Sequence, residues 1–333
     1  MKVGIIGCGA IASRAHIPSY RRSGADVVAV CDINIERAKQ LADRFNLSLV
    51  YSDYHELLES NVELVSICTP PQTHASIAID AAKMGKHVLV EKPMATNLED
   101  AERIVRECEA NNTKLCVMHE YRFTPCIQEA KGRISRGRLG EILSLEMTAH
   151  ATFPMRWSDS TWLYDRWGML DDVGVHFLDI LSFLTESYPK RVWTVARDIT
   201  GKMGFFNYIQ AIIELANSCV AYLDLSWIAG SYEWTVRAFG TAGKLDIDVR
   251  NNHLAELHGT ITPLDEIGAT LRKSSRTMNA VLTKRYFKGA LAYYDIVIGS
   301  YLQSIARSEP PPVGPEDGKR VVQFLQAIKQ AAP

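Results

Sequence analysis

The sequence predicts an α/β protein of two domains. The N-terminal domain is expected to hold a doubly wound parallel sheet, and the C-terminal α+β domain a large open, mostly antiparallel sheet. Strand and helix patterns alternate over residues 1–121, a glycine-rich turn follows the first strand directly, and after residue 192 strand patterns follow one another without helices. We place the domains at 1–121 and 122–333, and the last helix, about 316–331, is a candidate to pack back on the first domain.

The first domain is predicted to contain five strands that are short, apolar and rich in Val, Ile or Leu, as parallel strands buried on both faces are. These strands are expected at 2–6, 26–31, 64–68, 87–91 and 115–119. Helices are expected at 11–22, 35–45, 54–59, 73–84 and 98–110. Asn97 or Thr96 is predicted to cap the last of these helices.

The second domain begins with a helix pattern and then becomes rich in strands. Its helices are expected at 124–136, 173–184, 293–306 and 316–331. Its strands are expected at 142–152, 205–215, 219–226, 234–239 and 244–248, within a strand-rich region from 192 to about 257. A turn at 241–243 separates two of these strands, and a proline run at 310–312 separates the last two helices.

Composition argues against several classes of partner. The chain of 333 residues has a formal net charge of -1, which leaves no broad basic field for a nucleic-acid backbone. No apolar run approaches the roughly 20 residues of a membrane helix, and the N-terminus lacks the pattern of a signal peptide. The seven cysteines are scattered without a C-x-x-C pair, which indicates reduced thiols and no metal site. We therefore expect a cytoplasmic protein without nucleic-acid, membrane or metal partners.

Residues 7–12, Gly-Cys-Gly-Ala-Ile-Ala, follow the first strand and open the first helix, which is the G-x-G-x-x-A form of the Rossmann fingerprint. Gly7 permits the tight turn, Gly9 lets the backbone approach a pyrophosphate, and Ala12 allows close packing of helix on strand. Small residues also occur at such turns for packing alone, but the position after the first strand favours a dinucleotide site. The cofactor contacts expected in this turn are Gly7, Gly9, Ala10 and Ile11.

Asp32 ends the second strand 20 residues after Ala12, where an acidic side chain hydrogen-bonds the adenosine ribose of a dinucleotide. The alternative interpretation is that Asp32 caps the helix that starts near Asn34. A carboxylate at this position repels a 2′-phosphate, so the sequence favours NAD over NADP. Arg37 lies one turn further on and could weaken that preference, which keeps NADP as an alternative.

Polar residues follow three further strands, at the edge where ligands of parallel sheets gather. The expected cofactor contacts there are Thr69, Pro70, His74, Glu91, Lys92 and Arg122. Lys92 precedes a proline, which restricts its backbone and fixes the direction of its ammonium group. The alternative for Lys92 is a solvated surface charge, and the alternative for His74 is a side chain that only lies at a helix start.

The helix expected at 173–184 is apolar on nearly every side, so it should be buried. Asp172, His176 and Asp179 are spaced by four and three residues, which predicts one polar face. Buried polar groups either satisfy one another or line a site. A capping role for Asp171 or Asp172, and a satisfied core histidine, are the structural alternatives. Oxidation of an alcohol needs a base that titrates near neutral pH, and histidine supplies one.

These motifs together resemble the glucose-fructose oxidoreductase / inositol dehydrogenase / rhizopine-catabolism protein family. The resemblance covers the whole chain through the glycine turn, C-T-P-P-x-x-H at 68–74, E-K-P at 91–93 and D-x-G-x-H-x-x-D at 172–179. It implies that Lys92 and His176 lie at the nicotinamide and contact the reacting hydroxyl, and that Asp172 binds or orients the substrate. It also implies that the exposed face of the second sheet pairs subunits into a homodimer or homotetramer.

The sequence departs from the commonest family pattern near the expected substrate pocket. Residues 167–171 replace a run of glycines, and His119 stands where many members have asparagine. Both departures bear on which substrate is used and not on the fold. The substrate contacts expected in this region are Tyr121, Arg156, Trp162, Asp172 and His176, together with Lys92.

We therefore expect an NAD-dependent oxidoreductase that acts on a secondary hydroxyl or ketone of a sugar, inositol or sugar-nucleotide. His176, or the Lys92–His176 pair, is expected to take the hydroxyl proton, and Lys92 to stabilise the developing oxyanion. One alternative is an NAD-dependent glycoside hydrolase or lyase that recycles its cofactor in each turnover. The other is a dinucleotide-binding regulator without chemistry, against which the presence of Lys92, Asp172 and His176 argues.

Overall fold

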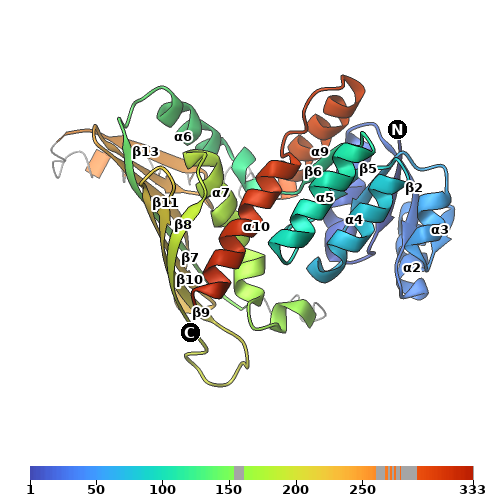
Figure 1. The fold of residues 1–333 in the computed structure, drawn as a ribbon, viewed down its shortest axis with the longest axis horizontal. Helices are drawn as coiled ribbons and strands as arrows, with labels where there is room; N and C mark the ends of the chain where they lie inside the picture. Colours follow the sequence, from blue (N-terminus) through green and yellow to red (C-terminus); the bar gives the residue numbers. More distant parts are fainter. Residues whose placement is uncertain are drawn as a thin grey trace. The chain divides into compact units, whose positions relative to one another are not determined.

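The computed structural model describes residues 1–153, 161–259 and 291–332, together with the single positions 267, 268, 271, 274 and 278 (Figure 1). The chain divides into two compact units. Unit 1 comprises Met1–Glu120 and Ala290–Val322, and unit 2 comprises Tyr121–Gly289 and Gln323–Pro333. This division differs from a single cut between residues 121 and 122, because a C-terminal segment belongs to unit 1.

Unit 1 is built on a six-stranded parallel sheet with the order β3-β2-β1-β4-β5-β6, which confirms the predicted Rossmann fold. Its strands are β1 (Lys2–Ile6), β2 (Asp26–Cys31), β3 (Leu49–Tyr51), β4 (Leu64–Ile67), β5 (His87–Val90) and β6 (Leu115–Val117). Strand β3 was not predicted from the sequence, because it has only three residues and these are exposed or half-buried. The sheet changes direction between β1 and β4, and this is where such sheets bind ligands.

The helices that follow these strands begin and end close to their predicted positions. They are α2 (Ile35–Phe45), α3 (Tyr54–Glu59), α4 (His74–Lys83) and α5 (Leu98–Ala110). Asn97 caps α5, because its side chain accepts a hydrogen bond from the backbone N–H of Asp100 at 2.9 Å. A short 3₁₀ turn, Pro71–Thr73, precedes α4 and accounts for the later start of that helix.

The first helix corrects the expectation of one regular helix over 11–22. It contains a π-turn at Ala12–His16, and the α-helical part α1 spans Ile17–Arg22. The backbone N–H of Ile17 bonds to the carbonyl of Ala12, five residues back. Pro18 supplies the reason, because a proline has no N–H with which to continue the regular ladder. Such π-turns are often found at functional sites.

The C-terminal segment completes unit 1. Helix α9 (Leu291–Ala306) packs along α1, and the Asp295 carboxylate accepts hydrogen bonds from Ser19 at 2.6 Å and from the Arg22 guanidinium at 2.6 Å. The buried hydroxyl of Tyr301 bonds to the carbonyl oxygens of Val88 and Lys114. Helix α10 (Pro315–Gln330) starts in unit 1 and ends in unit 2.

Unit 2 is built on a seven-stranded sheet with the order β13-β12-β11-β7-β10-β9-β8. Its strands are β7 (Ile142–Thr152), β8 (Pro189–Arg197), β9 (Tyr208–Leu215), β10 (Val220–Ser226), β11 (Ile228–Gly240), β12 (Lys244–Asp248) and β13 (His253–Leu257). All neighbours are antiparallel except β7 and β10, which confirms the predicted open, mostly antiparallel sheet. Strand β11 is longer than predicted because it continues through the exposed segment before Trp234.

Helices α6 (Pro125–Ser135) and α7 (Val175–Thr185) cover one face of this sheet (Figure 1). A second π-turn, Leu170–Gly174, precedes α7, so that helix starts later than predicted. Side chains alternate between a buried inner face and an exposed outer face along β7, β9 and β10. All seven cysteines are buried free thiols. Within the described part of the chain, no helix is both long and apolar enough to cross a membrane.

Candidate active site

The glycine turn has the backbone geometry that the sequence predicted. Gly7 has a φ of +94°, and a Cβ atom at this residue would lie 2.6 Å from the carbonyl carbon of Cys68. Only glycine fits that position, because the positive φ and the close backbone both exclude a side chain. Gly9, by contrast, has no neighbouring atom within 4 Å of the place where its Cβ would lie. The turn therefore leaves open space above Gly9, as a backbone cradle for a pyrophosphate requires.

Asp32 ties this turn to the end of β2. Its carboxylate accepts a hydrogen bond from the backbone N–H of Cys8 at 2.9 Å and another from the backbone N–H of Asn34 at 2.9 Å. The alternative interpretation of Asp32 as a helix cap is wrong, because Asn34 caps α2 through a bond from the Arg37 N–H. Burial, together with the charge of Asp32, raises the pKa of the Cys8 thiol to about 12, so this thiol is unreactive at neutral pH.

The other predicted contacts of the turn lie at the same carboxyl edge of the sheet. Gly9, Ile11 and Thr69 are half-buried, and Ala10, Arg37 and Pro70 are exposed. Thr69 and Pro70 follow β4, the neighbour of β1 on the side away from β2. Unit 1 thus brings together the ends of three adjacent strands around the turn, and the residues there are accessible to a ligand.

His74 joins the loop after β4 to the loop after β5. Its Nδ1 lies 2.8 Å from the carbonyl oxygen of Pro93, and its Nε2 lies 2.8 Å from that of Thr69. The side chain is completely buried, and burial lowers its pKa below that of an exposed histidine. The ring therefore connects the two loops, so His74 does more than lie at a helix start, which was the alternative considered from the sequence.

The end of β5 carries Glu91 and Lys92, followed by Pro93 across a cis peptide bond. Glu91 is 7% exposed, and its carboxylate lies 2.7 Å from Nε2 of His16 and 3.0 Å from the hydroxyl of Tyr294. Burial opposes ionisation of Glu91, but the hydrogen bond and charge of His16 and the charge of Lys92 lower the pKa of this carboxyl below its usual value. Glu91 is therefore a buried carboxylate beside the half-buried Lys92.

The polar face expected on the helix of unit 2 divides into separate roles. Asp179 is buried and forms a two-bond ion pair with Arg122, at 3.1 Å from Nε and 2.5 Å from an Nη. Asp171 pairs with Lys329 near the end of α10 at 2.7 Å. His176 is 7% exposed at the start of α7, and Asp172 is half-buried in the preceding π-turn. The Arg122–Asp179 pair lies within unit 2, and the cofactor contact predicted for Arg122 stays a prediction.

Aromatic rings surround His176. The Tyr121 ring meets it edge-on with a centroid distance of 4.6 Å, and the Trp234 ring lies at 6.3 Å. Tyr121 and Trp234 also contact one another at 5.1 Å. Tyr121 was predicted as a substrate contact from the sequence, whereas Trp234, which points inward from β11, was not. The only sequence feature that marks Trp234 is its place among the inward-facing residues of an alternating strand. That feature does not distinguish a site residue from a core residue.

Two predicted substrate contacts have less structural support. Trp162 is half-buried in a 3₁₀ turn, Thr161–Tyr164. Arg156 lies outside the described residues. Among the residues that the structure describes, no group of three or more His, Cys, Asp or Glu side chains is arranged to hold a metal ion.

Comparisons with known proteins match both units. Residues 1–119 match the model of an oxidoreductase family with an NAD-binding Rossmann fold, and residues 127–246 match the GFO/IDH/MocA C-terminal domain. The myo-inositol 2-dehydrogenase of Thermotoga maritima is 25% identical over 99% of this chain and 96% of its own length. The glucose-6-phosphate 3-dehydrogenase of Bacillus subtilis is 32% identical over 56% of this chain and 54% of its own length.

Solved structures share the fold of the whole chain. The WlbA dehydrogenase of Bordetella pertussis, solved with NADH and UDP-GlcNAcA, has a TM-score of 0.84 at 20% identity and covers 99% of this chain and 95% of its own. A levoglucosan dehydrogenase, solved with NADH and levoglucosan, has a TM-score of 0.79 at 21% identity and covers 99% of this chain and 96% of its own.

Proposed function

The chain belongs to the Gfo/Idh/MocA family of NAD-dependent oxidoreductases, and from that premise we propose that it transfers a hydride between NAD and a secondary hydroxyl or ketone of a sugar, inositol or sugar-nucleotide. The relatives described above are named for inositol, sugar-phosphate and anhydrosugar substrates, or were solved with a sugar-nucleotide. The substrate class of this chain is our inference from that range.

The observation that carries the proposal is the order of the strand ends in unit 1. The glycine turn follows β1, Asp32 ends β2 on one side, and Thr69 and Lys92 follow β4 and β5 on the other. A dinucleotide with its pyrophosphate at the turn and its adenosine ribose at Asp32 would extend across β4 toward β5. Its nicotinamide end would then lie toward Lys92, which is the residue with a cationic side chain at that strand end.

We assign distinct roles to the residues at this edge. The backbone of Gly7, Gly9, Ala10 and Ile11 would hold the pyrophosphate, because the open space above Gly9 admits it. Asp32 would bind the ribose hydroxyls and repel a 2′-phosphate, so we propose NAD as the working cofactor. Supporting contacts are assigned to Arg37, Thr69, Pro70, His74, Glu91 and Arg122.

The proposed mechanism assigns Lys92 and His176 to the same reacting hydroxyl. NAD, when bound, supplies the carbon that accepts the hydride of the alcohol. His176 accepts the hydroxyl proton as general base, and the Lys92 ammonium stabilises the negative charge that develops on the substrate oxygen. Asp172 orients the substrate, and Tyr121 and Trp162 line its binding site. Reduction of the ketone uses the same groups in reverse, with His176 as the acid.

Replacing Lys92 tests this assignment. Turnover of Lys92→Ala should fall by at least about 100-fold, because the developing oxyanion loses its preorganised charge. Formation of NADH from NAD, or of NADPH from NADP, would be followed over a panel of inositols, hexoses, uronic acids and nucleotide sugars. The affinity for NAD would be measured by direct titration. The matched control is Lys83→Ala, which removes an exposed lysine at the end of α4.

Three outcomes of this panel would contradict the proposal. Undiminished turnover in Lys92→Ala would remove Lys92 from the mechanism. Cleavage of a glycoside without net NADH formation would indicate the hydrolase or lyase alternative. Dinucleotide binding without turnover of any substrate would indicate the regulator.

We also propose that the protein forms a homodimer or homotetramer through the outer face of the unit 2 sheet. The strand register aligns Trp193, Ile212 and Tyr222 in one row across β8, β9 and β10, and each of these side chains is 44% to 53% exposed. The row continues across Glu146 and Arg237, which form an ion pair at 3.4 Å. An exposed row of large apolar side chains is typical of a surface that another molecule covers.

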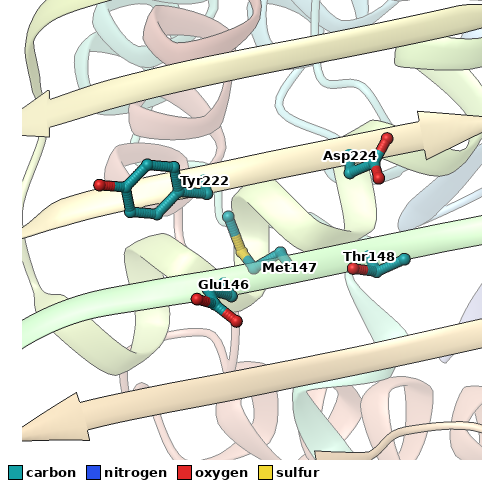
Figure 2. A pocket seen from close by; sticks show the side chains of 5 residues that line it. All are labelled: Glu146, Met147, Thr148, Tyr222 and Asp224. Carbon is teal, nitrogen blue, oxygen red and sulfur yellow. The ribbon is translucent and has the colours of Figure 1, made fainter.

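A shallow hollow of about 260 Å³ interrupts this face between β7 and β10. Figure 2 shows the side chains of Glu146, Thr148, Tyr222 and Asp224 along the two strands, and Met147 also lines the hollow. Because neighbouring residues alternate between the two faces, these polar side chains point away from α7 and His176. We therefore assign the hollow to the subunit contact and not to the substrate.

A further inference from the structure

A buried polar cluster in unit 1 lies directly behind Lys92. His16 is completely buried, and its Nε2 lies 2.7 Å from Oε1 of Glu91 while its Nδ1 lies 2.8 Å from the hydroxyl of Ser66. Tyr294, from α9, donates to the same Glu91 oxygen at 3.0 Å and meets the His16 ring edge-on at 5.3 Å. The cluster thus joins four elements: the π-turn of the first helix, β4, the end of β5, and α9.

The cluster fixes the orientation of the Glu91 carboxylate. A buried carboxylate is costly unless donors surround it. Oε1 accepts hydrogen bonds from Nε2 of His16 and from the hydroxyl of Tyr294. Oε2 accepts a hydrogen bond from the backbone N–H of Lys92 at 3.3 Å. Nε2 of His16 must carry the proton in this contact, because a carboxylate only accepts, and Ser66 can satisfy Nδ1 in either protonation state of the ring.

We propose that His16 is a positioning residue for Lys92, acting through Glu91. His16 ends the π-turn that begins at Ala12, the last residue of the glycine fingerprint. Glu91 holds the backbone N–H of Lys92, and so the same contacts join the cofactor turn to the residue whose ammonium group we assign to the reacting hydroxyl. The inference rests on the role proposed for Lys92. It adds that the direction of this ammonium group depends on His16, which lies 75 positions before Glu91 in the chain.

Loss of the His16–Glu91 contact should therefore reduce kcat and leave the affinity for NAD nearly unchanged. A freed Glu91 would no longer hold the Lys92 backbone in one place, and small misplacements of a catalytic group cost rates of the order of 10²-fold. His16 is not among the residues that we assign to NAD. Glu91 is assigned only a supporting contact, so the main cofactor contacts at the glycine turn and Asp32 stay in place. We expect kcat to fall about 10- to 100-fold, with the Kd of NAD changed by less than about threefold.

Two substitutions of similar polarity separate positioning from mere packing. In His16→Gln the side-chain amide nitrogen takes the place of Nε2, so the donor to Glu91 is kept and the Ser66 contact is lost. In His16→Asn the amide nitrogen takes the place of Nδ1, so the Ser66 contact is kept and the donor to Glu91 is lost. We expect His16→Gln to rescue kcat and His16→Asn to lose it. Equal losses in both variants would overturn the proposal, because they would reflect packing alone.

Helix α9 offers a second matched pair. Tyr294→Phe removes a hydroxyl that donates to Glu91, whereas Tyr301→Phe removes an equally buried hydroxyl that donates to backbone carbonyls. Each variant loses one buried hydroxyl group and its hydrogen-bond contacts on the same helix, so both melting temperatures should fall. We expect kcat to fall in Tyr294→Phe and to be unchanged in Tyr301→Phe. This pair decides the question if His16→Asn does not fold.

A readout without turnover separates this inference from the proposed function. The rate at which acetic anhydride acetylates Lys92, read by peptide mass, reports the surroundings of its amine, and the exposed Lys83 serves as internal standard. The rate at Lys92 should change in His16→Asn and Tyr294→Phe, and match the wild type in His16→Gln and Tyr301→Phe. An unchanged rate in all four variants would refute the positioning role. A changed rate in a protein that turns over no substrate would leave the positioning role standing and refute the proposed function.

Discussion

His74 shows how a single buried side chain can organise the edge of the sheet. Both of its ring nitrogens face backbone carbonyl oxygens, which only accept hydrogen bonds. A neutral imidazole has one N–H and can satisfy one of these carbonyls, whereas the protonated ring would satisfy both. Burial outweighs this gain and lowers the pKa of His74 below its usual value of 6.5. The brace between the loops that carry Thr69 and Pro93 is therefore neutral at physiological pH.

This lowered pKa predicts a loss of stability in mild acid. Below pH 6.5 the unfolded chain binds a proton that the folded chain resists, so the contribution of His74 is complete above that pH and is lost as the pH falls through the folded-state pKa. Between pH 7.5 and 5.5 the melting temperature should fall less in His74→Gln than in the wild type. Thermal unfolding at several pH values measures this difference.

His55→Gln is the control for that experiment. His55 is exposed and bonded to Asp53, which raises its pKa, so its contribution has the opposite sign and is lost as the pH rises. Its removal should not reduce the loss in acid. Parallel pH curves for His74→Gln and the wild type would contradict the role that we assign to the buried ring.

The sequence predicted the residues at the strand ends because their signal is local. Lys92 lies in a three-residue motif, and Asp32 stands at a fixed distance from the glycine turn. The support of Lys92 was not predictable in this way. His16 and Tyr294 lie 75 and 203 positions from Glu91 in the chain, and only the folded sheet brings them to it. Motifs thus identify the groups that face a ligand, whereas the groups behind them depend on tertiary packing.

At the scale of elements, the regular helices and strands followed from periodicity and capping, and the irregular ones did not. Helices α2, α3 and α5 have their predicted bounds. Two departures from regular α-helix, Ala12–His16 and Leu170–Gly174, are π-turns. The first follows residues that we assign to the cofactor, and the second contains Asp172, which we assign to the substrate. The periodicity of apolar residues is read over several helical turns. It therefore does not detect the one extra residue that a π-turn inserts. The sequence signal for the first π-turn was Pro18, whose missing N–H interrupts the ladder.

The glycine turn predicts two different effects of one added methyl group. Gly7→Ala should destabilise the protein by at least about 2 kcal/mol, because a positive φ and a backbone contact both oppose a Cβ. Gly9→Ala should leave the free energy of unfolding within about 0.5 kcal/mol of the wild type, because nothing lies within 4 Å of its Cβ. Its affinity for NAD should nevertheless fall at least about tenfold, because the Cβ would occupy the place of the pyrophosphate.

Denaturant unfolding and titration with NAD measure these two effects separately. Each variant serves as the control for the other, since the added group is the same and the residues are two positions apart. Wild-type affinity in Gly9→Ala would show that the turn is shaped for packing and not for a phosphate. Wild-type stability in Gly7→Ala would contradict the close approach of Cys68.

At the scale of the whole chain, the change from alternating strands and helices to consecutive strands predicts that a second domain starts at residue 122. The same pattern does not indicate which later segment packs with unit 1. Helix α9 belongs to unit 1 through Asp295 and Tyr301, which bond to residues far earlier in the chain. The sequence of α9 predicts only an apolar helix, and such a helix would pack equally well on either sheet. Its location depends on tertiary contacts, whereas a division by pattern assigns it to the second domain.

The exposed row on the unit 2 sheet predicts the effect of a single charge on assembly. In a two-fold contact the same patch of each subunit meets its copy, so one substitution enters the interface twice. Trp193→Asp would put two buried carboxylates into an apolar contact and should shift a dimer or tetramer toward monomer. Light scattering during gel filtration, at several protein concentrations, measures the mass of the assembly in solution.

Met84→Asp is the matched control, because Met84 is an exposed apolar residue of unit 1 that directly follows α4. It should leave the assembly unchanged. Titration with NAD checks that unit 1 stays intact in Trp193→Asp, since the residues assigned to the cofactor are predominantly in unit 1. Two results would show that this face is not the subunit contact. One is a wild-type protein that is monomeric at every concentration, and the other is a Trp193→Asp variant that keeps the wild-type mass. The aligned apolar side chains would then need another occupant, because a free surface gains nothing from keeping Trp193, Ile212 and Tyr222 in one row.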